Sequence, residues 1–280
     1  MKKSIQTLVK EMESEAAPLR STMEHIFGSN VQPENLFEVH AGDFWGMFQT
    51  RNYMRSRLAL ANEIHDKIAV PYDAPPAWEV VLWHYQEMLR LSAGDNLGLR
   101  YRFPFLLLHL DRDDDAFCFI RYWMINEDDE PGPREKMHKT SKEGDWLYGH
   151  EKDSRFLDIF KSVSATKLGS VSLPSLVALA CIKMRIMATH PIHKATQGKQ
   201  LDELIALIQS RNKNMLPALI NPTPLLSQQA PDYMSPGTPS ECYSIVEDAS
   251  KIWNQIPGAL KRLKNEFGAK PKYDCNLSTF

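Results

Sequence analysis

The sequence predicts an all-α protein, built as an array of antiparallel helix pairs with additional helices toward the C-terminal end. Three observations lead to this prediction. Apolar residues recur with helical spacing in most segments of the chain. Three such segments between Tyr53 and Trp123 follow one another through short turns. The apolar pattern of the second segment also returns after 35 residues, because Ala116 follows Val81 by that number.

The N-terminal segment has the pattern of one amphipathic helix. Its apolar residues fall on one helical face, and Gly28 follows as a helix stop; the face comprises Ile5, Leu8, Val9, Met12, Ala16, Leu19, Met23 and Ile26. Residues 29–50 break this spacing, with Pro33 and two glycines among four large aromatic residues. We therefore expect an irregular segment held down by its aromatic side chains, not a strand.

Three helices are expected next. Residues Tyr53 to Ile68 show helical spacing, and the prolines of the VPYDAPP stretch then interrupt the chain. A second helix starts at Pro76 and ends at SAGDN, and a third runs from the aspartates after Asp111 to about Met124. Acidic residues at a helix start interact favourably with the helix dipole, so Asp111, Asp113, Asp114 and Asp115 are expected to stabilise that start and not to catalyse acid or base chemistry.

The remaining chain is divided by a polar stretch. Residues 126–154 contain EDDEPGPREK and lack periodicity, which indicates an acidic linker or insertion between an N-terminal region, 1–125, and a C-terminal helical region, 155–280. In the latter, LPSLVALACIKMRIM predicts a buried helix after Ser172, and two amphipathic helices follow, the last interrupted at Pro257. The final GAKPKYDCNLSTF is expected to be a frayed or partner-ordered tail.

The repeat offset is close to that of tetratricopeptide repeats, which are helix pairs of about 34 residues. Val81, Tyr85 and Met88 match Ala116, Ile120 and Trp123 at equal offsets. Asp111 stands where glycine is common in such repeats, and Pro104 where a small helical residue is usual. The spacing therefore predicts a tetratricopeptide-like helix-pair array, an α-solenoid, with these two exceptions.

The strings YMRSRLALA, HYQEMLRLSAGDNLGLR and LLLHLDRDDDAFCFIRYW carry a resemblance to a family. They resemble fungal tetratricopeptide-like proteins known as MYND-type zinc finger proteins, which join this helical repeat to a cysteine-rich finger. The four cysteines of this chain are dozens of residues apart, so the resemblance does not extend to the finger or its zinc. It implies a helical fold and an interaction role, and no catalytic residues come with it.

The repeat register predicts a concave groove that binds a peptide. Its expected lining is polar and aromatic: Arg55, Asn62, His65, Asp66, Tyr101, Phe105 and His109. Other arginines nearby are candidates for a site that binds a carboxylate or phosphate, because a guanidinium offers a planar fork of donors: Arg51, Arg57, Arg100 and Arg102. Bridging of neighbouring helices is the alternative role for these arginines.

Metal and cofactor sites are not expected. His190 and His193 have a metal-like spacing, but Pro191 between them disfavours a shared helical face, and no H-E-x-x-H motif occurs. Further donors in the polar insertion would be His138, Asp145, His150 and Glu151. The chain also lacks a G-x-S-x-G elbow and a glycine-rich phosphate loop.

Composition narrows the partner class. The formal net charge of -2 gives no basic footprint for nucleic acid or an anionic membrane, and no segment reads as a signal peptide or membrane span, so a cytoplasmic or nuclear location is expected. The leading hypothesis is a helical-repeat scaffold that binds a peptide or partner protein in its groove. The alternative is a small-molecule enzyme with an active site enclosed by the helical array. The sequence leaves open whether the chain catalyses a reaction.

Overall fold

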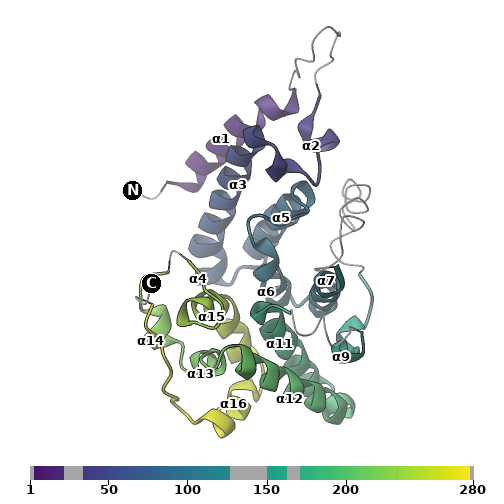
Figure 1. Ribbon diagram of the computed structural model, residues 1–280, viewed down its shortest axis with the longest axis vertical. Coiled ribbons are helices and arrows are strands. Elements are labelled where there is room, and N and C mark those ends of the chain that lie inside the picture. Colours follow the sequence, from purple (N-terminus) through teal and green to yellow (C-terminus); the bar gives the residue numbers. More distant parts are fainter. Residues whose placement is uncertain (1–2, 22–33, 127–149, 163–170, 232, 278–280) are drawn as a thin grey trace. The chain divides into compact units, whose positions relative to one another are not determined.

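The computed structural model describes residues 3–21, 34–126, 150–162, 171–231 and 233–277 (Figure 1). Most of these residues are helical, none of them forms a strand, and an isolated β-bridge joins Asp43 to Ser92. The all-α prediction is therefore confirmed. The chain divides into two compact units, one drawn from Met1–Leu106 and one from Leu107–Ile125 and His150–Phe280. The break between Leu106 and Leu107 falls inside a helix, a second break falls between Ile125 and Asn126, and most of the expected linker lies outside the described residues.

The first unit begins with α1, Ile5–Ala16, whose N-terminal amides are capped by the Ser4 hydroxyl. Leu8, Met12 and Ala16 are buried as the periodicity predicts. The helix was expected to continue to Ile26, but it ends before Pro18, which has no N–H to donate; Pro18–Arg20 form a 3₁₀ turn. Gly28 lies outside the described residues.

The described part of the aromatic segment forms short helical turns. The absence of a strand there agrees with the prediction, which was of an irregular segment. The turns are α2 (Leu36–Val39), η2 (Phe44–Gly46) and η3 (Phe48–Thr50). Gly42, at a φ of 95°, donates to Leu91 O and accepts from Ala93 N, which ties this segment to the end of the helix α5. The ring of Phe37 packs at 5.1 Å from Phe44 and 5.0 Å from Tyr53 between ring centroids.

The central helices of the first unit are α3, Arg51–Ile64, and α5, Pro75–Leu91. α3 packs against both α1 and α5. A π-helical turn, η4 (His65–Ala69), and the short α4 (Val70–Tyr72) continue α3 until Asp73 adopts a left-handed conformation. The predicted helices and the break between them are thus confirmed, whereas the π-helical turn was not foreseen. η5 (Leu99–Tyr101) follows and leads into α6, Phe103–His109.

The end of α6 explains one exception to the repeat pattern. Asp111 has a φ of 55°, Arg112 N donates to Leu107 O at 2.9 Å, and Asp111 N donates to Leu108 O at 3.2 Å. This pair of bonds is the Schellman arrangement, in which the left-handed residue is usually glycine. An aspartate therefore occupies a backbone position for which glycine has the lowest strain.

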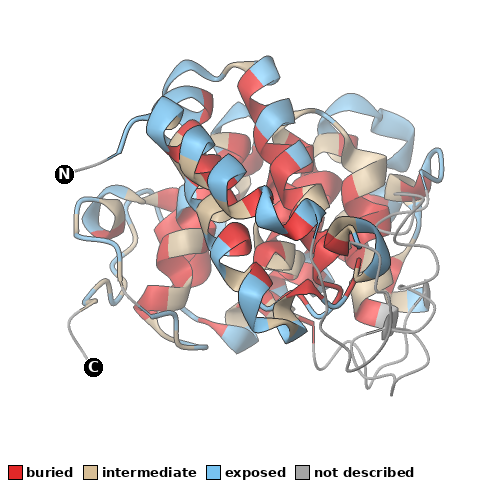
Figure 2. Cartoon of the chain, turned by 90° about the horizontal axis from the view of Figure 1, so that it is seen from above, coloured by how far each residue is buried: buried red, intermediate tan, exposed pale blue. Residues whose placement is uncertain are grey.

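The second unit is organised around α11, Leu173–Thr189, which packs against α12 (Lys194–Arg211) and α15 (Pro239–Gln255). Nearly every residue from Leu176 to Met184 is buried, as the continuous apolar run predicts. In Figure 2 other helices show buried and exposed positions side by side, as amphipathic helices require. The further elements are α7 (Asp113–Asn126), η6 (Ser154–Phe156), α9 (Ile159–Ser162), η7 (Pro191–His193), α13 (Met215–Ile220), α14 (Thr223–Leu226) and α16 (Ala259–Phe267).

The C-terminal tail is tied to its own unit, so the expectation of a frayed tail is wrong for residues 268–277. Tyr273 OH donates to Asn221 O at 2.7 Å, Gln228 Nε2 donates to Cys275 O at 2.6 Å, and Asp274 N donates to Asn214 Oδ1 at 3.2 Å. These partners lie on other segments, which local periodicity does not reveal. Across the described ranges, no helix has both the length and the apolar character needed to cross a membrane.

Candidate functional site

The first unit carries a cluster of two arginines and two aromatic residues, which we call the arginine–aromatic surface: Trp45, Phe48, Arg51 and Arg55. Phe48 and Arg55 are exposed, and Trp45 and Arg51 are half-buried. Local turns hold these residues. Thr50 Oγ1 donates to Met47 O at 2.8 Å and also to Phe44 O, which closes η2 and η3 against the start of α3. Arg51 and Arg55 are one helical turn apart on α3 and therefore share a face.

Both guanidinium groups lie against Trp45. The Cζ atoms of Arg51 and Arg55 are each 5.5 Å from its ring centroid, and Arg51 is 5.5 Å from Phe48 as well. Arg51 Nε also donates to Trp45 O at 2.9 Å. Neither guanidinium forms an ion pair with a carboxylate in the described part of the chain. Phe48 is 83% exposed, so the surface combines uncompensated positive charge with an apolar side chain in water.

The predicted peptide groove is not assembled as expected. His65 is only 3% exposed and Phe105 only 1%, so neither lines an open groove. Asn62 Oδ1 accepts from Tyr85 OH at 3.2 Å. The prediction assumed a regular helix through residue 68, whereas the π-helical turn that starts at His65 adds a residue to the helical turn and so changes which face the following side chains occupy.

The other groove residues have separate surroundings. Asp66 is exposed and accepts from His65 Nδ1 at 2.8 Å, while the half-buried Tyr101 stacks under the guanidinium of Arg100 at 5.0 Å. His109 belongs to the second unit. Of the predicted groove, Arg55 alone is part of the arginine–aromatic surface.

The predicted anion-binding arginines do not converge either. Arg100 Nη2 donates to Tyr101 OH at 2.9 Å, and Arg102 Nη2 lies 3.4 Å from His65 Nε2. Arg57 is buried, at 4% exposure, and donates to Tyr53 OH. Arg51 remains on the surface. Arg57, over the ring of Trp83 on α5, and Arg102, beside His65, thus contact neighbouring helical segments, which was the alternative role. Arg100 contacts Tyr101 and Asp95, which lie in its own segment.

Arg57 creates an unusual electrostatic environment inside the first unit. Its Cζ lies 4.4 Å from the ring centroid of Trp83, and its Nε and Nη2 have no acceptor among the residues that the structure describes. Burial, followed by the positive charge of Arg57, lowers the pKa of His84 to about 4. His84 is therefore neutral at pH 7, in a site that resists a second positive charge.

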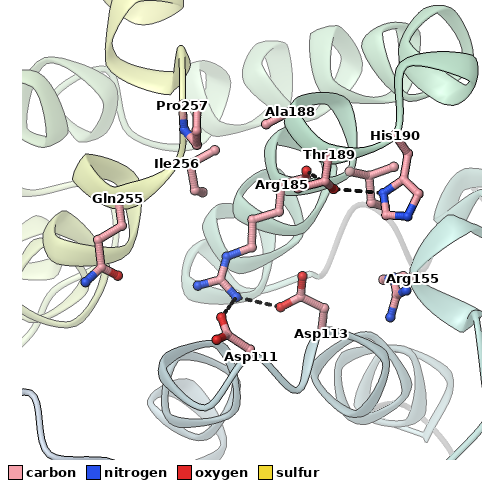
Figure 3. Close-up of a pocket in the computed structure, with 11 residues that line it drawn as sticks. Asp111, Asp113, Arg155, Arg185, Ala188, Thr189, His190, Gln255, Ile256 and Pro257 are labelled. Carbon is pink, nitrogen blue, oxygen red and sulfur yellow. Dashed lines mark hydrogen bonds and ion pairs between the residues drawn. The ribbon is translucent and has the colours of Figure 1, made fainter.

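The second unit contains a pocket of about 430 Å³, drawn in Figure 3. Four charged side chains, Asp111, Asp113, Arg155 and Arg185, line it together with Thr189, His190 and an apolar wall that includes Ile256 and Pro257. Figure 3 shows Arg185 reaching from α11 toward the two aspartates, with Gln255, Ile256 and Pro257 on one side and His190 and Arg155 on the other. The volume suits a small ligand.

Ion pairs fix the floor of this pocket. Arg185 Nη1 lies 2.7 Å from Asp113 Oδ1 and 3.2 Å from Asp111 Oδ1. Burial raises the pKa of Asp113 above its ordinary value, although the charge of Arg185 opposes this shift. At the rim, Thr189 Oγ1 donates to Arg185 O and accepts from His190 Nδ1, both at 2.8 Å. Because Nδ1 donates in this pair of hydrogen bonds, Nε2 of a neutral His190 is left as an acceptor.

Asp114 joins α7 to η6 behind the pocket. Its carboxylate accepts from Asp153 N at 3.1 Å, from Arg155 N at 2.9 Å and from Arg155 Nη1 at 2.9 Å. The expected position in the first turn of α7 is confirmed for Asp113, Asp114 and Asp115, whereas Asp111 precedes the helix. Some of their hydrogen bonds reach distant segments: Asp115, for example, pairs with His150 as well as with the nearby Arg112.

We expect the Asp114→Ala substitution to loosen η6 selectively. Removal of the carboxylate leaves two amides and a guanidinium without their acceptor, which costs about 2 kcal/mol. Amide hydrogen exchange at Asp153 and Arg155 should accelerate, while exchange in α12 stays unchanged. Unaltered protection of both amides would contradict this assignment. Asp202→Ala, on the exposed face of α12, is the matched control.

The predicted histidine pair lies beside the pocket but is not part of a metal cluster. The rings of His190 and His193 are 6.4 Å apart between centroids, and Phe156 contacts both. In the ranges that the structure describes, no group of three or more His, Cys, Asp or Glu side chains is placed to hold a metal ion. His138 and Asp145 lie outside those ranges.

The pocket residues Arg155 and Arg185 were not predicted as site residues, since they come from segments far apart in the sequence and neither belongs to a motif. Phe48 was noted only as one of the aromatics of an irregular segment. Two candidate sites thus emerge, one in each unit. Comparison of the chain with protein-family models, curated proteins and solved structures yields no match.

Proposed function

We propose that this chain binds a partner protein, and that the arginine–aromatic surface of the first unit is the docking site for an acidic segment of that partner. One observation carries the proposal. Two guanidinium groups, which have no carboxylate partner among the described residues, lie against Trp45, next to a phenylalanine that is 83% exposed. An exposed aromatic side chain beside an uncompensated charge is more typical of a binding surface than of a surface that has no partner.

The residue types of the arginine–aromatic surface indicate which kind of ligand it binds. Trp and Arg are the residues that most often dominate binding energy at protein interfaces. A carboxylate from the partner would receive a planar pair of donors from Arg51 or Arg55, whose stacking on Trp45 limits the loss of side-chain freedom. An apolar side chain of the same segment would cover Phe48. The complementary ligand is therefore an acidic peptide with at least one apolar or aromatic residue.

The finer fold assignment belongs to the same proposal. We propose that α3 and α5 form one helix pair of a tetratricopeptide-like array, related to the fungal MYND-type zinc finger proteins without their finger. Support comes from the packing of α3 on α5 and from the burial of Val81, Tyr85 and Met88 at the positions that the repeat pattern assigns. The docking site lies at the N-terminal end of α3 and in the preceding turns, instead of in the predicted groove.

Binding to acidic peptides tests the proposal. Fluorescent peptides of equal length, with an aromatic residue and an increasing number of Asp or Glu residues, are titrated with the protein by anisotropy. We expect affinity to rise with acidic content and to fall with salt. The Arg55→Glu and Phe48→Ser variants should each lose at least about tenfold in affinity, equivalent to about 1.4 kcal/mol.

Two controls test whether binding depends on this surface and on the acidic peptide. Lys10→Glu makes the same charge reversal at an exposed site of α1 and should bind like the wild type. A single-stranded oligonucleotide of matched charge should bind weakly. Affinity that is independent of acidic content, or equal losses for Lys10→Glu and Arg55→Glu, would overturn the assignment of this surface.

A further inference from the structure

The pocket of the second unit is not used by the proposed partner binding, and its charges show what it accepts. Arg155 is already engaged by Asp114 at 2.9 Å and faces Asp153 at 3.8 Å. Arg185 is engaged by two aspartates, Asp111 and Asp113. Four carboxylates thus surround two guanidiniums, a balance that disfavours phosphate and other multiply charged anions.

Arg185 keeps one side of its guanidinium available. Both aspartates contact Nη1, whereas Nε and Nη2 have no hydrogen-bond or ion-pair partner in the described part of the chain. In Figure 3 the group turns one side to the aspartates and the other toward Gln255 and Ile256. The Nε–Nη2 edge carries two parallel N–H donors, which is the geometry that binds a single carboxylate through both oxygens.

Asp111 offers the opposite charge close by. It contacts Arg185 through Oδ1, and its side chain is 91% exposed, so Oδ2 faces solvent at the pocket. The Schellman bonds hold its backbone in the left-handed conformation and therefore fix where the carboxylate emerges. A primary ammonium group is the ligand chemistry that a solvent-facing carboxylate beside an arginine accepts.

One wall of the pocket is apolar, beside the polar Thr189, His190 and Gln255. Ile186 from α11 and Ile256 and Pro257 from the end of α15 line the same pocket. An aliphatic side chain placed there would lose contact with water and gain about 25 cal/mol for each Å² buried. The three features, a guanidinium edge, a nearby carboxylate and an apolar wall, match the three parts of one molecule.

We propose that this pocket binds a free amino acid with an apolar side chain, its carboxylate on the Nε–Nη2 edge of Arg185 and its ammonium on Asp111. The protein is expected to bind the zwitterion and not either charge alone. This site is independent of the arginine–aromatic surface, which belongs to the other unit.

Calorimetric titration with L-leucine, N-acetyl-L-leucine and L-leucinamide tests the proposal on the full chain. The first keeps both charges, the second lacks the ammonium and the third lacks the carboxylate. We expect saturable binding of L-leucine and at least about tenfold weaker binding of both analogues. Equal affinity for N-acetyl-L-leucine would show an anion site, and equal affinity for L-leucinamide a cation site; either result overturns the proposal.

Two substitutions assign the binding to the pocket. Asp111→Asn removes the charge, and asparagine tolerates the left-handed backbone, so the variant should fold and bind L-leucine at least about tenfold more weakly. Asp73→Asn makes the same change at another left-handed position, in the first unit, and should bind like the wild type. Wild-type affinity in Asp111→Asn would overturn the proposal. So would the absence of binding to any apolar amino acid up to about 10 mM, a range that covers weak millimolar ligands.

Discussion

The Lys183→Met variant is expected to lose about 3 kcal/mol of unfolding free energy, the largest effect of any single substitution considered for this chain. Lys183 lies within α11 with none of its surface exposed. Its Nζ donates to Arg155 O at 2.8 Å and to Leu157 O at 2.7 Å, and it sits 5.1 Å from the ring centroid of Phe117. Methionine keeps an unbranched apolar side chain as far as Cε but lacks the amine, so both carbonyl oxygens lose their donor.

Burial lowers the pKa of Lys183 to about 8, and the charge of Asp158 opposes that shift. At pH 7, below this pKa, the amine keeps its proton and both hydrogen bonds are charge-assisted. Urea unfolding at pH 7 measures the loss. Lys161→Met, at a side chain that is 85% exposed, is the matched control and should change the free energy by less than about 0.5 kcal/mol. An equally small change in Lys183→Met would show that the two bonds contribute nothing.

The second large effect is a loss of stability in acid caused by His84. Its pKa is lowered to about 4 in the folded chain, from 6.5 as an isolated group, by burial and by the charge of Arg57. Between these two values the unfolded chain binds more protons than the folded one. Stability is therefore fully present above pH 6.5 and falls as the pH drops toward 4, by about 3 kcal/mol at most.

Replacement of His84 by glutamine tests this origin. Glutamine does not titrate. The unfolding free energy of the variant should therefore not show the decrease between pH 6.5 and 4 that His84 causes in the wild type. Unfolding of both proteins is measured at several pH values, with His40→Gln, in the same unit, as the control. If His84→Gln lost stability in parallel with the wild type, the acid sensitivity would have another source.

The helices were predictable because their signals are local. α5 and α11 follow from a few apolar residues at helical spacing, whose burial the structure confirms. The left-handed conformation of Asp111 was also indicated by the local sequence, since this residue stands where the repeat pattern commonly has glycine. The π-helical turn at His65 had no such sign. His65, at which this turn begins, contacts Trp78 at 5.4 Å between ring centroids and is buried, so it does not line the expected groove.

The sites were less predictable because they depend on distant segments. Arg55 was predicted to line a peptide groove; it is exposed, and its contact with Trp45 depends on how the turns of residues 44–50 fold back on α3. Arg185 lies in an apolar run and had no functional sign of its own. It became a candidate only because the chain brings Asp111 and Asp113 to it. The spacing of residues in the sequence predicts which of them share a face of one helix, whereas a site is formed by residues from several helices and turns.

The most direct test of the central claim is a map of the residues that respond to an acidic peptide. Isotope-labelled protein is titrated with the best acidic peptide of the series, and the nuclear magnetic resonance shifts of tryptophan indole and arginine Nε–H groups are followed. Partner binding at the proposed surface predicts the largest shifts at Trp45, Arg51 and Arg55, with little change at Trp253, which is buried in the second unit. Shifts that leave Trp45 and Arg55 unmoved while other residues respond would contradict the claim.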